Sequence, residues 1–77
     1  MKITQEVQDR KVTLKLEGNF TYTQRKAFQE VMRTVTTDQV EHIIIDLSQV
    51  VFLDSAALGL LMITHRQLQA ERCTLSL

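Results

Sequence analysis

Hydrophobic and polar residues alternate most regularly over Lys11–Glu17, where aliphatic side chains occupy every second position. A period of two is typical of a strand with one face in the core and the other in water. A weaker alternation covers residues 2–7, and residues 8–10 can turn the chain between the two segments, so the pattern predicts a hairpin. Gly18 and Asn19 tolerate the backbone angles of a turn and are expected to end the second strand.

The spacing of apolar residues becomes helical over Thr23–Val35. We expect Thr21 or Thr23 to cap this helix by accepting a hydrogen bond from a backbone amide, and the threonine-rich segment 34–38 to end it. The residues predicted to face the core are Ala27, Phe28, Val31, Met32 and Val35.

Ile43–Ile45 is a run of β-branched residues without alternation. Such a run is typical of a strand that is buried on both faces inside a parallel sheet. Asp46 stands at the C-terminal end of this strand, and an apolar connection over residues 47–53 leads to the next element.

A second helix is predicted to open at Asp54–Ser55 and to run to about Ala70. Residues 73–77 alternate again and predict a final strand. The residues of the second helix that are expected to face the core are Leu58, Leu61, Met62, His65 and Leu68.

The predicted elements follow one another in the order β-β-α-β-α-β. Alternation of strands and helices predicts an α/β fold, here a mixed four-stranded sheet with crossover helices. Because 77 residues have room for only one hydrophobic core, we expect a single domain over residues 1–77.

Nine basic and nine acidic side chains give the chain a formal net charge of zero. Direct nucleic-acid binding is not expected, because nonspecific binding needs a basic face that displaces counterions. The single cysteine, Cys73, cannot form an internal disulfide and is expected in the core. His42 and His65 lack metal-ligand spacing, and no apolar stretch approaches the roughly 20 residues of a membrane span. We therefore expect a cytoplasmic protein without metal, cofactor or membrane insertion.

Ser55 is the residue that best fits a chemical role. At a helix start, free amides and the positive end of the helix dipole tolerate a phosphate, which would add about −1.5 to −2 charges beside Asp54. The plainer interpretation is that Asp54 or Ser55 simply caps the helix. A catalytic interpretation lacks a visible base for Ser55, and the chain is too short to wall a pocket around Asp46 and Asp54 as an acid–base pair.

The second helix is apolar around most of its first half. Either it is buried on two sides, or one side is exposed as a docking surface. Small side chains beside the serine would let the backbone of a partner approach closely. The residues that raise this question are Ala56, Ala57, Gly59, Leu60 and Ile63.

Residues 43–61, IIIDLSQVVFLDSAALGLL, resemble the STAS domain, the module of anti-sigma-factor antagonists and of sulfate-transporter tails. The family pattern is a buried strand ending in Asp-Leu-Ser, an apolar loop, then Asp-Ser, a few small residues and Leu-Gly with more leucines. The hairpin and the first helix also fall where that fold has them. The resemblance therefore implies a STAS-like fold over essentially the whole chain.

In the antagonist branch of this family, the serine that matches Ser55 is phosphorylated by a kinase that is also an anti-sigma factor. The resemblance implies that the unphosphorylated chain binds this serine kinase and frees its sigma factor, and that a phosphatase resets the switch. Asp54 and Asp46 would shape the phosphorylation site, and no catalysis is implied. The residues implied to contact the partner are Ala56, Ala57, Gly59, Leu60 and Ile63.

The chain departs from the family pattern in three ways. Thr21 stands where many members have the aspartate of a Gly-x-x-Asp turn, and Ala56 and Ala57 replace a second serine and a glycine. Full domains of the family add at least one more helix, so we expect a C-terminally truncated domain that self-association completes. The alternative function within the family is a STAS module that is not phosphorylated and binds a membrane transporter or a lipid-trafficking ATPase complex.

Overall fold

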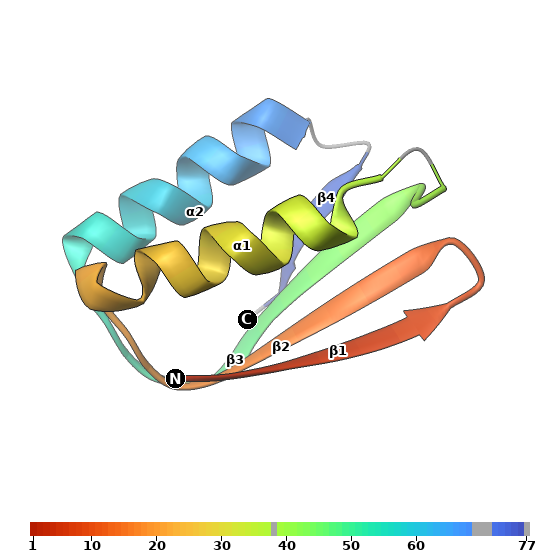
Figure 1. The fold of residues 1–77 in the computed structure, drawn as a ribbon. Coiled ribbons are helices and arrows are strands. Elements are labelled where there is room, and N and C mark those ends of the chain that lie inside the picture. Colours follow the sequence, from red (N-terminus) through yellow and green to blue (C-terminus); the bar gives the residue numbers. More distant parts are fainter. Residues whose placement is uncertain (38, 69–71, 77) are drawn as a thin grey trace.

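Strands and helices alternate along the chain in the predicted order (Figure 1). The computed structural model describes residues 1–37, 39–68 and 72–76. Its elements are β1 (Lys2–Gln8), β2 (Lys11–Phe20), the short 3-10 helix η1 (Tyr22–Gln24), α1 (Arg25–Val35), β3 (His42–Leu53), α2 (Ser55–Leu68) and β4 (Cys73–Ser76).

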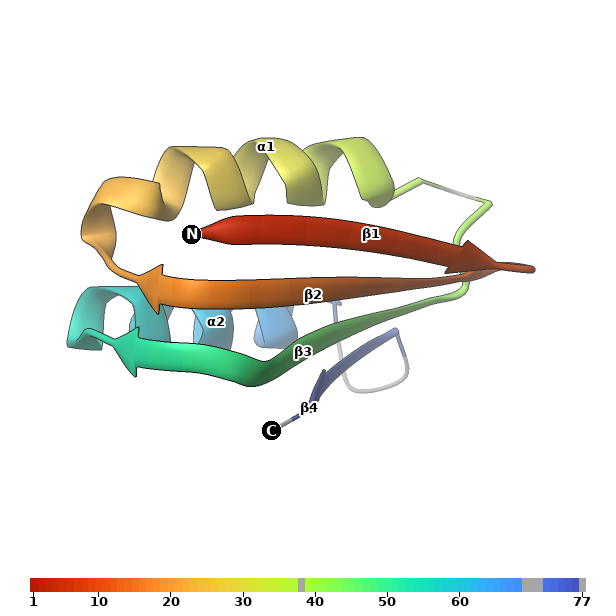
Figure 2. The same ribbon diagram turned by 90° about the horizontal axis from the view of Figure 1, so that it is seen from below.

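The strands form one sheet in the order β1-β2-β3-β4. β1 runs antiparallel to β2, whereas β2, β3 and β4 run parallel to one another. Both α-helices lie on the same face of the sheet, and Figure 2 looks onto the opposite, uncovered face. The predicted mixed four-stranded sheet with crossover helices is therefore confirmed.

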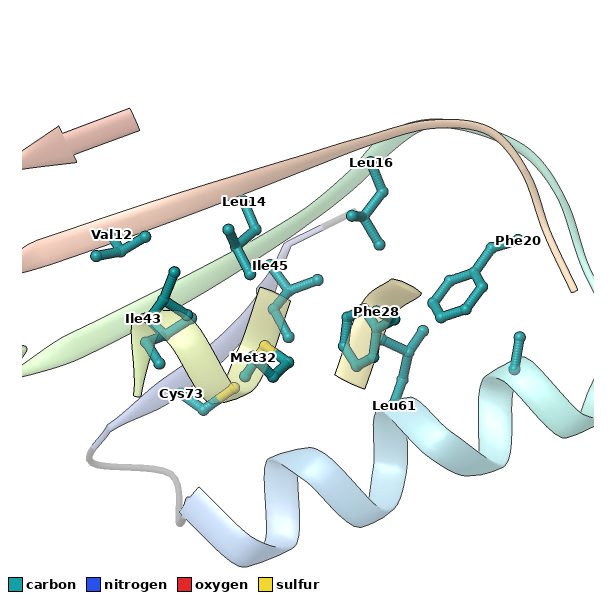
Figure 3. Packing of buried hydrophobic residues seen from close by; sticks show 12 residues of the cluster. Val12, Leu14, Leu16, Phe20, Phe28, Met32, Ile43, Ile45, Leu61 and Cys73 are labelled. Atoms are coloured by element: carbon teal, nitrogen blue, oxygen red, sulfur yellow. The ribbon is translucent and has the colours of Figure 1, made fainter. Parts of the chain in front are cut away.

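The core fills the space between the helices and the covered face of the sheet (Figure 3). Val12, Leu14 and Leu16 point into it from β2, and each is at most 3% exposed. At the end of the same strand, the ring centroid of Phe20 lies 5.2 Å from that of Phe28 in α1. This buried aromatic pair packs the end of β2 against the first helix.

The hairpin between β1 and β2 is present as predicted, with Asp9 at a φ of 56° in its turn. Gly18 also has a positive φ, 92°, but it does not end β2. The strand continues to Phe20 after a shift in its pairing with β3 between Gly18 and Asn19. The predicted strand end is therefore wrong, because an irregularity in the ladder accommodates the glycine conformation.

β3 is one continuous strand, not a short strand followed by a connection over residues 47–53. Its first half was expected to be buried on both faces. Ile43 and Ile45 are buried, but Ile44 faces the other side and is only half-buried. That expectation is wrong, because both helices cover the same face of the sheet.

α1 begins at Arg25, slightly later than predicted, because η1 precedes it. Thr21 stands at the N-cap position of η1 and not of α1, and its amide and its hydroxyl both donate to Oε1 of Gln24, over 2.9 and 2.7 Å. α1 ends at Val35 as predicted, and Asp38 lies outside the described residues. Ala27 is exposed, so its placement in the core is wrong. The buried residues of α1 are Phe28, Met32 and Val35.

α2 is described over Ser55–Leu68, and the predicted helix end near Ala70 lies outside the described residues, as does Leu77 at the end of the predicted last strand. The side of α2 that faces the core differs from the predicted side. Leu58 and Met62 are 49% and 54% exposed and do not belong to the core. The buried residues of α2 are Ala57, Leu61 and Thr64, and the partly buried Leu68 packs against the hydrophobic core.

Candidate functional site

The predicted phosphorylation site lies where two parallel strands end side by side. Phe20 of β2 pairs with Leu53 of β3, and each strand then leads into a helix on the same face of the sheet. The beginnings of η1 and α2 consequently meet at one end of the molecule (Figure 1).

Asp54 joins these two helix starts. Its Oδ1 accepts a hydrogen bond from the amide of Ala57 over 2.8 Å, the geometry of an N-cap on α2. Its Oδ2 accepts from the amide of Tyr22 over 3.0 Å. Its own amide donates to the carbonyl oxygen of Phe20 over 3.3 Å. Asp54 is therefore the residue that caps the second helix, as one of the two sequence interpretations held.

Ser55 is the first residue of α2, and it is exposed to solvent. Because Asp54 supplies the cap, the Ser55 hydroxyl has no capping task. Within the described residues, no hydrogen bond involves this side chain. An incoming phosphoryl donor can therefore reach the hydroxyl without first breaking an interaction of the fold.

Tyr22 and Arg25 border the same end of the molecule, a feature that the sequence patterns did not predict. The guanidinium carbon of Arg25 lies 4.2 Å from the centroid of the Tyr22 ring, a cation–π contact. Tyr22 is 55% exposed. A tyrosine followed three positions later by an arginine at a helix start is the local signal that could have suggested this pair.

Asp46 lies farther back in β3, with its own local contacts. Its Oδ1 accepts from the amide of Ser48 over 2.9 Å. Hydrogen bonds from the amide and hydroxyl of Ser48, and to a smaller extent the positive charge of Lys15, hold the pKa of Asp46 below its ordinary value. None of its described contacts reaches Ser55, so its role in shaping the phosphorylation site stays a prediction.

The predicted partner-binding residues of α2 differ in exposure. Ala56 is exposed, Gly59 and Leu60 are half-buried, and Ile63 is 53% exposed. Ala57 is only 1% exposed and belongs to the core, so its assignment to a docking surface is wrong. The helical repeat explains the error, because Ala57 shares the core-facing side with residues four and seven positions later.

Two of these residues line a groove between the helices, with a volume of about 530 Å³. Leu60 and Ile63 form part of its α2 wall, while Phe28, Met32 and Arg33 form part of its α1 wall. Phe28 and Met32 are buried at the base of this groove, so its solvent-exposed apolar side chain comes from Ile63 of α2.

The described ranges contain no group of three or more histidine, cysteine, aspartate or glutamate residues that could hold a metal ion. In the same part of the chain, no helix has the length and apolar character to cross a membrane. Cys73 is buried in the core as expected, and burial raises the pKa of its thiol.

The amino-acid sequence matches the family model described as Mlab, STAS domain, over residues 3–77. The chain belongs to the STAS domain family. The match spans both helix starts at the Asp54 junction and both walls of the groove, so the site is built from elements of the STAS domain. No curated protein matches the sequence.

Solved structures similar to this STAS chain include two anti-sigma factor antagonists. The one from Mycobacterium paratuberculosis has a TM-score of 0.82 and 25% identity, and the match covers 96% of this chain and 64% of that chain. SpoIIAA in its unphosphorylated form has a TM-score of 0.75 and 24% identity, with 96% and 71% covered. Mglu has a TM-score of 0.80 and 22% identity, with 94% and 18% covered. The STAS chain thus spans less than two thirds of the mycobacterial antagonist and less than a fifth of Mglu.

Proposed function

We propose that this STAS chain is an anti-sigma factor antagonist that works by phosphorylation-controlled partner switching. Unphosphorylated at Ser55, it binds an anti-sigma factor that is also a serine kinase, and so regulates transcription. The observation that carries the proposal is the exposed Ser55 at the start of α2, with the capping task given to Asp54. The likeness to two antagonists supports it, one of them solved in an unphosphorylated form.

Charge and apolar contact account for the switch. A phosphate on Ser55 adds about −1.5 to −2 charges at a surface that also carries the exposed apolar side chains of Leu58 and Met62. A partner that buries these side chains must desolvate the phosphate or leave it unpaired, and either is costly. Phosphorylation therefore weakens the complex directly, without unfolding of the chain.

The remaining parts of the cycle follow from the same site. A phosphatase removes the phosphate and restores the binding form, and the chain acts as substrate and switch, not as enzyme. We place the docking surface on Ala56, Gly59, Leu60 and Ile63 together with the neighbouring exposed Leu58 and Met62, and we place the cycle in the cytoplasm. Residues 1–77 act as one STAS unit, with Asp54 holding the phosphorylated turn.

A second candidate function is a STAS module that binds a membrane transporter or lipid-trafficking ATPase complex without phosphorylation. The groove between α1 and α2 favours it, because Ser55 is not among the residues that line this groove. The description of the matching family model, Mlab, is also compatible with a STAS domain outside the antagonist branch.

Capture with two forms of the chain separates these functions. One bait carries serine at position 55 and the other phosphoserine, and both are incubated with lysate of the source organism. A bait with phosphoserine at the exposed Ser48 is the matched control. We expect a serine kinase on the unphosphorylated and control baits only. An ATPase of a transport complex held equally by all three baits would support the second function instead.

A further inference from the structure

The charges of the chain are divided unevenly between the helix layer, formed by α1 and α2, and the rest of the molecule. The helix layer carries four basic side chains and a single acidic one, Glu30. The other eight acidic residues fall outside the two helical ranges, 25–35 and 55–68. The net charge of zero therefore combines a basic helix layer with an acidic remainder, and the field of the layer attracts acidic groups. The basic residues of the layer are Arg25, Lys26, Arg33 and Arg66.

The groove between α1 and α2 lies within this helix layer, and its volume is about 530 Å³. Phe28 and Met32 are buried at its base, Leu60 and Leu68 are half-buried, and Ile63 is 53% exposed. No acidic residue is among the described residues that line it. A partner that covers the groove therefore gains hydrophobic free energy from Ile63 and meets no repelling carboxylate in the walls.

Arg25 continues the α1 wall of the groove toward the N-terminal end of the helix. It stands four positions before Gln29 and eight before Arg33, and both of these line the groove, so the three form one row along α1. Arg33 pairs with Glu30 over 2.8 Å. Arg25 is half-buried against the Tyr22 ring, and none of the ion pairs among the described residues involves it. Arg25 is thus a cation at one end of the groove whose charge no carboxylate balances.

The groove lies on the side of α2 that is remote from β4. Figure 2 shows α1, α2 and β4 in that order across the sheet. The two walls and the base of the groove consist of described residues. Its shape is therefore set by how the two helices pack on the sheet, not by the sheet edge at β4.

We propose that this groove receives an amphipathic helix of a partner protein, and that an acidic residue of that helix pairs with Arg25. A helix enters such a groove with apolar residues at positions i, i+3, i+4 and i+7. A concave surface suits a helix better than a flat membrane, and the basic helix layer favours acidic residues on the polar face of the partner helix. The inference rests on the proposed function in one respect, because Leu60 and Ile63 belong to the docking surface placed there, but it requires no phosphate on Ser55.

Fluorescence anisotropy with labelled helical peptides tests the chemistry of the partner. Three peptides share one length and one stripe of leucines, and their polar positions are glutamate, glutamine or lysine. The glutamate peptide should bind at least about tenfold more tightly than the lysine peptide, since it complements the helix layer, and added salt should weaken it. A glutamate peptide of the same composition with scrambled leucines should bind at least about tenfold more weakly, because no stripe remains to enter the groove.

Matched variants locate the bound peptide. Arg25→Gln should weaken binding of the glutamate peptide about threefold or more, while Arg10→Gln removes the same charge from an exposed hairpin position and should change little. Ile63→Ser should weaken it about tenfold by removing apolar contact. Val7→Ser is its control, because Val7 is 68% exposed on β1. Circular dichroism confirms that all four variants fold.

Equal binding of the glutamate and lysine peptides overturns the proposal, as do equal losses in Arg25→Gln and Arg10→Gln or no binding of the glutamate peptide up to millimolar concentration. Cosedimentation with phosphatidylglycerol vesicles tests the competing occupant. Vesicle binding that Ile63→Ser abolishes, without peptide binding, would assign the groove to a membrane surface and also overturn the proposal. None of these assays involves a kinase or a modified Ser55, so their failure and a failure of the phosphorylation cycle are separate results.

Discussion

The amide of Tyr22 donates a hydrogen bond to Oδ2 of Asp54 over 3.0 Å, although 32 positions separate the two residues in sequence. The other oxygen of the same carboxylate caps α2. One side chain thus fixes the start of η1 relative to the start of α2. Ser55 is the next residue, so this contact holds the backbone of the proposed phosphorylation site in place.

Replacing Asp54 tests this junction. Asp54→Ala loses both hydrogen bonds and should lower the free energy of unfolding by about 2 kcal/mol, roughly 1 kcal/mol for each bond. Asp54→Asn keeps one acceptor oxygen and should lose about half as much. Asp9→Asn removes the same charge at an exposed turn where asparagine tolerates the positive φ, and it should change little. Urea unfolding measures all three. Equal losses in Asp54→Asn and Asp9→Asn would contradict the account.

The side of α2 that faces the core predicts that two leucine substitutions differ in their effect on stability. Leu61 is fully buried, so Leu61→Ala should cost about 2–5 kcal/mol of unfolding free energy through lost contacts and a cavity. Leu58 is 49% exposed, and Leu58→Ala should cost much less. The two variants make the same chemical change three positions apart, and thermal or urea unfolding compares them. A larger loss for Leu58→Ala would show that the helix faces the core with another side.

Hydrophobic periodicity predicted the order of elements because each strand and helix buries one consistent face. The β2 pattern over Lys11–Glu17 has a strict period of two, and the structure buries the three apolar side chains within it. α2 could not be oriented in the same way. Leucine, methionine and isoleucine surround its first half, so several stripes fit the helical spacing equally well and the wrong one was chosen.

Alanine substitutions at Gly18 and Gly59 are expected to change stability in opposite directions. Gly18 has a φ of 92°, so Gly18→Ala should destabilise the chain by about 1–2 kcal/mol even though the nearest atom to an added Cβ, Cα of Met1, is 3.9 Å away. Gly59 is inside α2, and nothing lies within 4 Å of an added Cβ. Gly59→Ala should therefore stabilise the chain by about 0.5–1 kcal/mol. Denaturant midpoints of the two variants should move in opposite directions. A shift of both in the same direction would count against these conformations.

The lowered pKa of Asp46 predicts a pH dependence. The pKa of Asp46 is lower in the folded chain than in the unfolded chain. Ionised Asp46 therefore stabilises the fold at any pH above the pKa of the unfolded chain, and this stabilisation is lost as the pH falls through the pKa of the folded chain. Ser48→Ala removes one donor and keeps the amide, so the pKa should rise toward the ordinary value without reaching it. Carboxyl NMR titration measures this shift, with Ser55→Ala as a control expected to leave it unchanged. An unaltered pKa in Ser48→Ala would refute the role of the hydroxyl.

The sequence located Ser55 and Asp54 because adjacent polar residues before an apolar helix indicate a helix start. It could not predict the Tyr22–Asp54 hydrogen bond, since that contact depends on β2 and β3 ending at the same level of the sheet. The assignment of Ala57 to the surface was wrong for a second reason. Its burial follows from the side of α2 that meets the sheet, which composition alone leaves open.

The central claim is that Ser55 accepts a phosphate, and intact-mass analysis tests it most directly. The chain is incubated with ATP and fractionated lysate of the source organism, together with Ser55→Ala and with Ser48→Ala as the exposed-serine control. A known substrate confirms kinase activity in each fraction. The account predicts that the wild type and Ser48→Ala each gain one phosphate and that Ser55→Ala gains none. Fractions that phosphorylate the known substrate but leave the wild type unmodified, or that modify Ser55→Ala equally, would contradict it.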